Sequence, residues 1–409
     1  MLHDVRVLEV SAPATMLAGS ILADLGADVV VVEPPAGSPA RRLEPFLDEI
    51  PGIERSLTWH ALNRNKRAIT LDLDSIDGRN LFTTLAENFD IVIESAAPGG
   101  RAPLDGLKLS AKTIRCTVGG FARSGPKSDY ASSDLLVMAS TGTPAMSGDP
   151  DRPPLFHPVP QSIMEGGAET AIAALACLLA RDRDGEGQQA EISERIAAMM
   201  SALSVPIAIG AGNPEITRSG TAGLSPDARI PSIFECADGY MIVTVPAFGP
   251  SFGPMTQRLA KWAAEEGHVS RDIAEVNWIT FAADVRTKAA SPAQLMALVK
   301  GVASLCRSKT KAELSAAARK LGLLAAPVMD MKDVAESEQY RERGLWTPVR
   351  IGPDGREIDA PARFAQFSNF TIETKRAAPS LSQHTAEILK TEAAISTSEL
   401  QALFVHGII

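Results

Sequence analysis

The stretch Val5–Pro34, VRVLEVSAPATMLAGSILADLGADVVVVEP, decides the fold. Its two ends, Val5–Val10 and Asp28–Pro34, are short apolar runs rich in β-branched residues, which is typical of buried strands. Between them, Thr15–Gly26 has the apolar spacing of a helix. A strand, a helix and a second strand in this order predict a βαβ unit, in which the two strands run parallel.

The pattern repeats along the N-terminal half of the chain. Strand-like runs at Arg67–Leu73 and Asp90–Ser95 flank a helical segment at Asp74–Phe89, and Thr113–Phe121 follows as a further strand. Strands that lack polar alternation and are separated by amphipathic helices form parallel sheets covered on both faces. The sequence therefore predicts the α/β class with a parallel sheet.

A second, smaller domain follows a change in composition. Residues 210–231 are dominated by glycine, proline and polar side chains, which indicates a linker or a mobile loop, with Gly220 and Gly223 inside it. Ser232–Val245 then has the pattern of a hairpin that turns at Asp238-Gly239. A chain of 409 residues is longer than one compact core usually accommodates, which agrees with two domains.

The composition excludes several classes of partner and cofactor. The net charge is −9, so there is no basic field to attract nucleic acid or anionic lipid. The four cysteines are far apart and form no CxxC pair, which argues against a zinc site and a disulfide framework and favours reduced core thiols. We therefore expect no metal, no nucleic acid and no disulfide.

The N-terminus and the apolar segments favour a cytoplasmic protein without a membrane span. The first residues lead directly into a strand-like run instead of a signal peptide. The longest apolar stretch, Ala171–Ala180, is about half of the length that crosses a bilayer. We expect no transmembrane helix.

The expected ligand site is the edge of the sheet where the strands end. In open parallel sheets, loops and helix N-termini at the carboxyl ends of the strands receive ligands, phosphates in particular. Neither GxGxxG after the first strand nor GxxxxGK[ST] occurs in the chain. A nicotinamide or flavin dinucleotide enzyme and a P-loop NTPase are therefore not supported.

Eight segments, taken together and in order, resemble the class III CoA-transferases, the family of formyl-CoA transferase, carnitine CoA-transferase and α-methylacyl-CoA racemase. Any one of them is a weak signal, but the set covers essentially the whole chain. They are VLEVSAPATMLAGSILADLGADVVVVEPPAGSPAR, NRNKRAITLDLDSIDGRNLF, DIVIESAAPGG, GGFARSGPKSDYASSDLL, LLARDRDGEGQQAEIS, FECADGYMIVTV, LLAAPVMDMKDV and SLSQHTAEIL.

The resemblance implies a Rossmann-like large domain, a smaller inserted α/β domain and two chains that interlock as a dimer, with CoA between the large domain of one chain and the small domain of the other. It implies acyl-CoA as a substrate that exchanges CoA with a carboxylic acid through an acylated aspartate. The division that we expect is a large domain at residues 1–209, a linker at 210–231, a small domain at 232–321 and a return to the large domain at 322–409.

The position of the family aspartate carries a hydrocarbon in this chain. Counting back from the turn at Gly185, and matching Gly167 to the glycine that follows the nucleophile by four residues, the resemblance puts Ile163 in that place. The nearest carboxylates are Glu165 and Glu169. Glu165 is the candidate nucleophile because a helix start stabilises an anion, and the alternative is an ordinary acid in the first turn of the helix.

The resemblance also suggests the residues that bind CoA. Asn65, Lys66 and Arg67 lie in the run that the family places at the nucleotide end of CoA, where cations can contact the phosphates. Arg101 stands two positions before Pro103, which replaces the arginine that often meets the CoA phosphates. The alternative for these four residues is a set of solvated polar and charged side chains.

Two hypotheses follow. In the first, the chain is the non-catalytic subunit of a heteromer whose partner carries the aspartate nucleophile. In the second, it is a self-sufficient homodimeric acyl-CoA:carboxylate CoA-transferase that uses Glu165. The racemase branch of the family is disfavoured because Ser133 occupies the place of its histidine.

Overall fold

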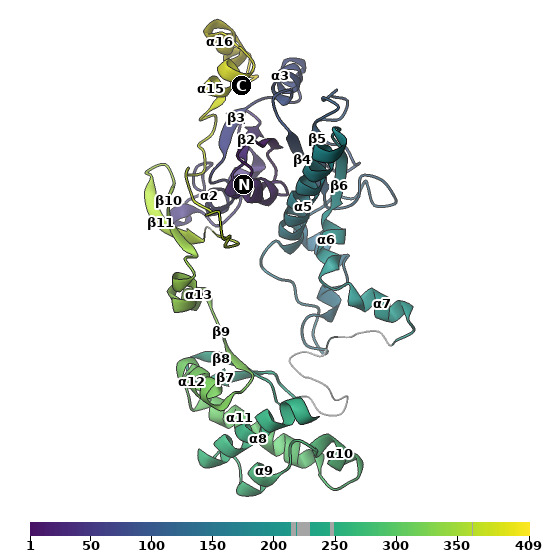
Figure 1. Cartoon of the computed structure of the whole chain (residues 1–409), viewed down its shortest axis with the longest axis vertical. Coiled ribbons are helices and arrows are strands. Elements are labelled where there is room, and N and C mark those ends of the chain that lie inside the picture. Colours follow the sequence, from purple (N-terminus) through teal and green to yellow (C-terminus); the bar gives the residue numbers. More distant parts are fainter. Residues whose placement is uncertain (214–217, 219–229, 246–248, 362) are drawn as a thin grey trace. The chain divides into compact units, whose positions relative to one another are not determined.

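The computed structural model describes residues 1–213, 218, 230–245, 249–361 and 363–409 (Figure 1). Most of the predicted linker at 210–231, with Gly220 and Gly223, lies outside the described residues. The chain divides into two compact units. The first contains Met1–Ala145, Phe156–Ile216 and Gln339–Ile409, and the second contains Met146–Leu155 and Thr217–Glu338.

The first unit is built on a six-stranded sheet in which every neighbouring pair of strands is parallel. The strand order is β3-β2-β1-β4-β5-β6, which is the order of Rossmann-type sheets and places the change of direction between β1 and β4. The predicted α/β class with a parallel sheet is confirmed. The strands are β1 (Arg6–Val10), β2 (Asp28–Glu33), β3 (Arg67–Thr70), β4 (Ile91–Ser95), β5 (Ile114–Gly119) and β6 (Gln189–Ser193).

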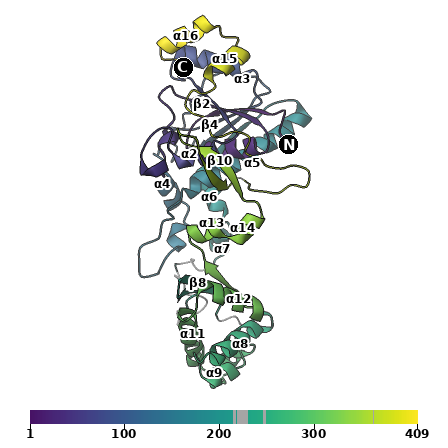
Figure 2. The same cartoon turned by 90° about the vertical axis from the view of Figure 1, so that its left-hand side faces the viewer.

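Side chains of alternate residues enter two separate cores, one on each face of the sheet. Val7 of β1 packs into the core under α1 and α5, whereas its neighbour Leu8 packs into the core under α3, α15 and α16. Figure 2 shows the C-terminal helices α15 and α16 beside α3. The helices of this unit are α1 (Met16–Asp24), α2 (Leu57–Leu62), α3 (Ile76–Ala86), α4 (Asp134–Ala139), α5 (Gln161–Asp184), α6 (Glu194–Met200), α7 (Ser204–Gly210), α14 (Glu338–Glu342), α15 (Thr385–Glu392) and α16 (Thr397–Val405).

Helix α5 is a core helix of this unit, although it is long and apolar enough by composition to span a membrane. It extends well beyond the apolar stretch Ala171–Ala180 seen in the sequence. Its inward face, which includes Ala171, Ala174 and Cys177, packs against the sheet together with α1. The helix ends at Gly185, whose left-handed backbone lets its N–H bond to the carbonyl of Arg181.

A short hairpin of the returning chain completes the first unit. Strand β10 (Trp346–Ile351) pairs with β11 (Arg356–Pro361) in antiparallel register. Val349 and Ile351 of β10 pack against Leu47, which lies in a short 3₁₀ turn between β2 and α2. The C-terminal segment therefore contacts the N-terminal half of the chain, as the return of the chain to the large domain requires.

The second unit combines a three-stranded antiparallel sheet with helices packed on one face. The predicted hairpin is confirmed, because β7 (Ile233–Cys236) pairs with β8 (Gly239–Val243). Strand β9 (Ala325–Val328) pairs with β8 and holds these residues in the second unit, whereas the sequence predicted the return to the large domain at residue 322. The helices are α8 (Gly249–Glu265), α9 (Arg271–Glu275), α10 (Phe281–Arg286), α11 (Pro292–Arg307), α12 (Lys311–Leu321) and α13 (Met331–Glu336).

The four cysteines are buried, and each is a free thiol. Cys116 and Cys177 lie in the core of the first unit, and Cys236 and Cys306 in that of the second. Burial raises the pKa of Cys116 and of Cys306 to about 12, so both remain protonated and unreactive at neutral pH. The expected core thiols are confirmed.

Candidate active site

The position that the resemblance assigns to the family aspartate, Ile163, lies in the first turns of α5. Ile163 is the third residue of the helix and Glu165 the fifth. Because α5 leads back to the start of β6, its N-terminus lies at the carboxyl edge of the sheet, where parallel sheets bind ligands. The sequence predicted Glu165 at the helix start, but the helix begins earlier, at Gln161, so the free N–H groups of the first turn belong to the residues before Glu165.

Two glycines bring the backbone of α5 into contact with its neighbours. A Cβ atom on Gly166 would lie 2.8 Å from Cγ of Glu194, and one on Gly167 would lie 2.9 Å from Cβ of Leu17. Neither approach is open to a residue with a side chain without movement of a neighbour. These contacts hold Glu165 at a fixed place between α1 and α6.

Asp134 attaches the start of α4 to the start of α5. Its Oδ1 accepts hydrogen bonds from the backbone N–H of Ser162 at 2.7 Å and from Oγ of Ser162 at 2.8 Å. Asp134 is the first residue of α4, and the hydroxyl of Ser133 caps that helix. The second oxygen of Asp134, Oδ2, is buried without a hydrogen-bond partner.

Two glutamates complete a cluster of three carboxyl groups around this point. Glu165 is partly buried, and its Oε2 is buried without a hydrogen-bond partner. Burial, together with the charge of Asp134, raises the pKa of Glu165. Glu194, the first residue of α6, is 5% exposed, and the same two causes raise its pKa to about 7. We call Asp134, Glu165 and Glu194 the carboxyl cluster.

Sequence reasoning did not single out Asp134 and Glu194. Each follows a serine and opens a helix, so each has the local pattern of an ordinary acid in the first turn. Their meeting depends on topology, because the helices α4, α5 and α6 pack against one another at the same edge of the sheet. The sequence did contain one signal: the dipeptides Ser133-Asp134 and Ser193-Glu194 both place an acid after a serine at a helix start on that edge of the sheet.

Lys66 is fully buried, and its ammonium points into the domain. The Nζ atom donates to Oε2 of Glu9 at 2.7 Å, to the carbonyl of Met16 at 2.9 Å and to Oδ1 of Asn63 at 2.9 Å. Gly19 leaves room for this ion pair, since a Cβ atom there would lie 1.8 Å from Oε2 of Glu9. Burial raises the pKa of Glu9, and the ammonium of Lys66 opposes that rise.

Asn65 and Arg67 line a cavity of about 430 Å³ near the amino ends of β2 and β3. The guanidinium of Arg67 forms two hydrogen bonds to Asp28, at 3.0 and 2.6 Å. The side chain of Asn65 donates to Asp24 and to the carbonyl of Glu373, and its Oδ1 accepts two backbone N–H groups of the returning chain. These two residues lie at the amino edge of the sheet, away from Glu165.

Arg101 belongs to the loop after β4 and lies at the carboxyl edge, like the carboxyl cluster. It is exposed, and it forms no ion pair with any residue of the described chain. Its neighbour in the loop after β5, Arg123, is instead held by Asp105 at 2.7 Å and by the carbonyl of Gly100 at 2.8 Å. The four residues proposed to contact CoA therefore do not lie together. Of these four, only Arg101 lies at the carboxyl edge without an ion pair to the described residues.

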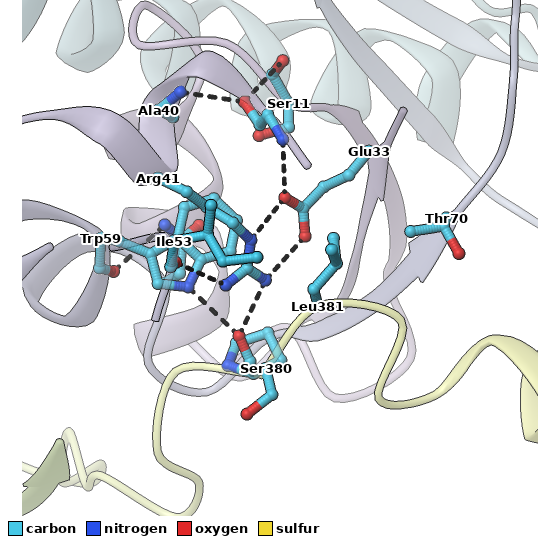
Figure 3. Close-up of polar contacts among 12 residues, drawn as sticks. Ser11, Glu33, Ala40, Arg41, Ile53, Trp59, Thr70, Ser380 and Leu381 are labelled. Carbon is cyan, nitrogen blue, oxygen red and sulfur yellow. Dashed lines mark hydrogen bonds and ion pairs between the residues drawn. The ribbon is translucent and has the colours of Figure 1, made fainter. Parts of the chain in front are cut away.

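A buried ion pair stands at the carboxyl end of β2 (Figure 3). The guanidinium of Arg41 donates to both oxygens of Glu33, at 2.7 and 2.8 Å, and to the carbonyl of Pro379 at 3.0 Å. Its carbon lies 3.9 Å from the centre of the Trp59 ring. Both charged side chains are fully buried. The arginine is therefore saturated by partners and holds the returning chain against the sheet.

The sequence from residue 2 to residue 385 matches the family model described as CoA-transferase family III. The chain belongs to the CoA-transferase family III. The resemblance stated from the eight segments is thus confirmed at the level of the family. Members of this family transfer CoA between an acyl-CoA and a carboxylic acid, and the chain is a transferase of this class.

Two similar CoA-transferases match along nearly their full length. The chain is 28% identical over 400 residues to the succinyl-CoA:(R)-benzylsuccinate CoA-transferase subunit BbsE of Thauera aromatica, covering 94% of this chain and 92% of that protein. It is 28% identical over 409 residues to the succinate--glutarate CoA-transferase of Agrobacterium fabrum, covering 95% and 94%. A CAIB/BAIF family protein from Brucella suis has a similar structure, with a TM-score of 0.77, 26% identity and coverage of 95% and 98%.

A family III CoA-transferase acts on acyl-CoA substrates, so the carboxyl edge of this sheet is the place to look for reacting groups. Among the described residues, no group of three or more His, Cys, Asp or Glu side chains could hold a metal ion. The carboxyl cluster is therefore not a metal centre in this structure. Its chemistry is that of carboxyl groups close enough for the charge of Asp134 to raise the pKa of both Glu165 and Glu194, in addition to the effect of burial.

Proposed function

We propose that this family III CoA-transferase chain is the non-catalytic subunit of a heteromer, and that a partner chain supplies the acylated aspartate. The observation that carries the proposal is the environment of Glu165. A carboxyl group attacks a thioester as its anion, and an anion needs N–H donors or a nearby cation. Oε2 of Glu165 has no donor, and the charge that acts on this carboxyl group is that of Asp134, which is negative and raises its pKa together with burial.

Two further observations support the subunit role. Ile163 stands where the resemblance puts the family aspartate, and a hydrocarbon cannot be acylated. The similar protein of Thauera aromatica is itself described as a subunit. Both observations are independent of the pKa of Glu165.

The second candidate is a self-sufficient homodimer that uses Glu165 as the nucleophile. In its favour, Glu165 is held rigidly at the carboxyl edge by the packing of Gly166 and Gly167. This candidate requires that acyl-CoA or a second chain bring a donor to the carboxyl group, because in this chain Glu165 has only like charge beside it.

For CoA itself we propose Arg101 as a contact of the phosphates. It is the one residue of the four suggested by sequence that combines exposure, an unpaired charge among the described residues and a place at the carboxyl edge. We assign Asn65, Lys66 and Arg67 to the architecture instead, because their polar groups already bind Asp24, Glu9 and Asp28. Succinyl-CoA is the first donor to test, since the similar protein of Thauera aromatica is described as using it.

We propose that the partner chain interlocks with this one and covers an apolar surface of the first unit. Helices α4 to α7 and the turn before α7 carry large apolar side chains that are at least two-fifths exposed, more than solvated helices usually show together. They are Leu135, Leu136, Ile172, Leu179, Ile196, Met200, Leu203, Ile207 and Ile209.

The test is the turnover of the assembled enzyme with Glu165→Ala in this chain. At concentrations that saturate assembly, we expect kcat for transfer from succinyl-CoA to stay within about twofold of the wild type. Glu169→Ala, an exposed glutamate one turn further along α5, is the matched control. Loss of turnover by a factor of a hundred or more with Glu165→Ala alone would establish the homodimer mechanism in place of the subunit role.

A further inference from the structure

The three acids of the carboxyl cluster lack a cationic partner among the described residues. Asp134, Glu165 and Glu194 come from the starts of three different helices, and in the described chain none of them forms an ion pair with a lysine, arginine or histidine. Buried charges elsewhere in this unit are paired, as Glu9 is with Lys66. Burying acidic groups together without a cation is unfavourable, so the cluster calls for a positive group from outside the chain.

Glu194 makes this need specific. It is 5% exposed, yet its carboxyl group has no hydrogen bond from any residue of the described chain. Its Cγ lies against the backbone of α5 at Gly166, beside Glu165. Burial and the charge of Asp134 both raise the pKa of Glu194. Asp134 is held in place by Ser162 through one oxygen only, which leaves the other without a donor.

The surroundings indicate the kind of group that fits. Leu135 and Leu136 of α4 and Ile196 of α6 are all more than half exposed next to the cluster. A free metal ion or a small hydrated cation would leave these apolar side chains in water. A lysine or arginine of another polypeptide can cover them with its aliphatic stem and place its N–H donors at the carboxyl oxygens.

We infer that the carboxyl cluster is a docking site for a basic side chain of the partner chain, with Leu135, Leu136 and Ile196 as its apolar rim. This inference rests on the proposed function, because the chain that docks here is the one that supplies the nucleophile. Fully desolvated pairs of opposite charge at an interface are the contacts whose loss raises the dissociation constant most.

The first experiment uses butylguanidinium chloride as a probe that carries both a guanidinium group and an aliphatic tail. Thermal unfolding of the purified chain at pH 8 is followed with millimolar probe, against sodium chloride of equal ionic strength. We expect the probe to raise the Tm of the wild type and of Glu169→Gln. The double variant Glu165→Gln/Glu194→Gln, which keeps the shape of the cluster and removes two charges, should bind the probe at least tenfold more weakly.

The second experiment identifies the source of the basic group by sedimentation of the chain alone and with a family III chain that carries the aspartate. We expect the double variant to raise the dissociation constant of the mixed complex at least tenfold, with Glu169→Gln unchanged. Self-association of this chain that is lost in the double variant would overturn the assignment and give the site to a second copy. A probe that acts equally on wild type and double variant, or unchanged mixed assembly, would overturn the docking site itself.

The failure of this inference and that of the proposed function are distinguishable. Probe binding and assembly do not depend on which chain is acylated, whereas the turnover of Glu165→Ala at saturating partner does. A chain can therefore dock through the carboxyl cluster and still be catalytic, or lack the docking site and still be a helper subunit.

Discussion

Two groups of charges, one fully buried and one buried in part, lie in the same unit of this protein and are built in opposite ways. Glu9 with Lys66 and Glu33 with Arg41 are fully buried ion pairs, each with a charge of the other sign within 2.7 Å and further hydrogen bonds. The carboxyl cluster instead gathers three acids without a cation in the described chain. The difference shows that in this fold the saturated pairs hold the architecture, and it is the ground on which we propose that the unsaturated cluster marks the face that binds a partner.

The largest expected effect comes from breaking a saturated pair. Lys66→Met leaves the carboxylate of Glu9 fully buried without its cation, and removal of one partner of a buried pair costs about 3–5 kcal/mol of unfolding free energy. Urea unfolding measures the change. The double variant Glu9→Gln/Lys66→Met, which removes both charges, should recover most of the loss, and a single variant as stable as the wild type would show that the pair does not hold the sheet.

The carboxyl cluster should respond with the opposite sign. The pKa of Glu194 is raised from 4.5 to about 7, so the folded chain binds more protons than the unfolded chain between these values, and stability falls as the pH rises through that window. Glu194→Gln removes this dependence. The shift corresponds to about 3 kcal/mol, so the variant should match the wild type below pH 4.5 and exceed it by roughly that amount above pH 7.

Thermal or urea unfolding of Glu194→Gln at several pH values tests this prediction, with Glu169→Gln, an exposed glutamate of α5, as the control. A lower stability of Glu194→Gln than of the wild type at pH 8 would contradict the contrast between the two groups of charges. It would mean that Glu194 has a favourable partner in the folded chain.

A smaller effect is expected from the glycine that positions the cluster. A Cβ atom on Gly167 would lie 2.9 Å from Cβ of Leu17, so Gly167→Ala must push α5 away from α1. Overpacking of this kind costs about 1–3 kcal/mol. The double variant Gly167→Ala/Leu17→Gly should relieve the clash, and crystallography or hydrogen exchange of α5 in the single variant should report its displacement. An unchanged Tm would mean that the two helices adapt freely.

The smallest change in stability is expected at Arg101. It is exposed and unpaired among the described residues, and surface substitutions of this kind alter unfolding free energy by about 0.5 kcal/mol or less. A charged hydrogen bond to a phosphate contributes about 1.5–3 kcal/mol, so Arg101→Ala in the assembled enzyme should raise KM for acyl-CoA about tenfold or more. Arg183→Ala, exposed at the far end of α5, is the control, and equal KM values would remove Arg101 from the CoA site.

The fold was predictable because its signals are local. The apolar runs at Val5–Val10 and Asp28–Pro34 and the helical spacing between them depend only on neighbouring residues, and they correspond to β1, α1 and β2. The hairpin at Asp238-Gly239 was likewise visible in the sequence. The end of the second unit was not, because the pairing of β9 with β8 joins residues far apart in the chain.

The candidate site was predictable only in part, and for the same reason. Glu165 stood out because it is close in sequence to Ile163, which the resemblance puts in the place of the family aspartate. Asp134 and Glu194 did not, because each looks like the first acid of a separate helix and only the packing of α4, α5 and α6 brings them together. The charge of Lys66 suggested a ligand contact, yet the sequence contained no sign that Glu9 and Asn63 surround its ammonium.

The most direct test of the subunit role is to find which chain becomes acylated. The assembled enzyme is incubated with succinyl-CoA and hydroxylamine, which converts an acylated carboxyl group to a hydroxamate, and the peptides are analysed by mass spectrometry. We predict a hydroxamate on an aspartate of the partner chain and none on this chain. A hydroxamate on Glu165 would contradict the account.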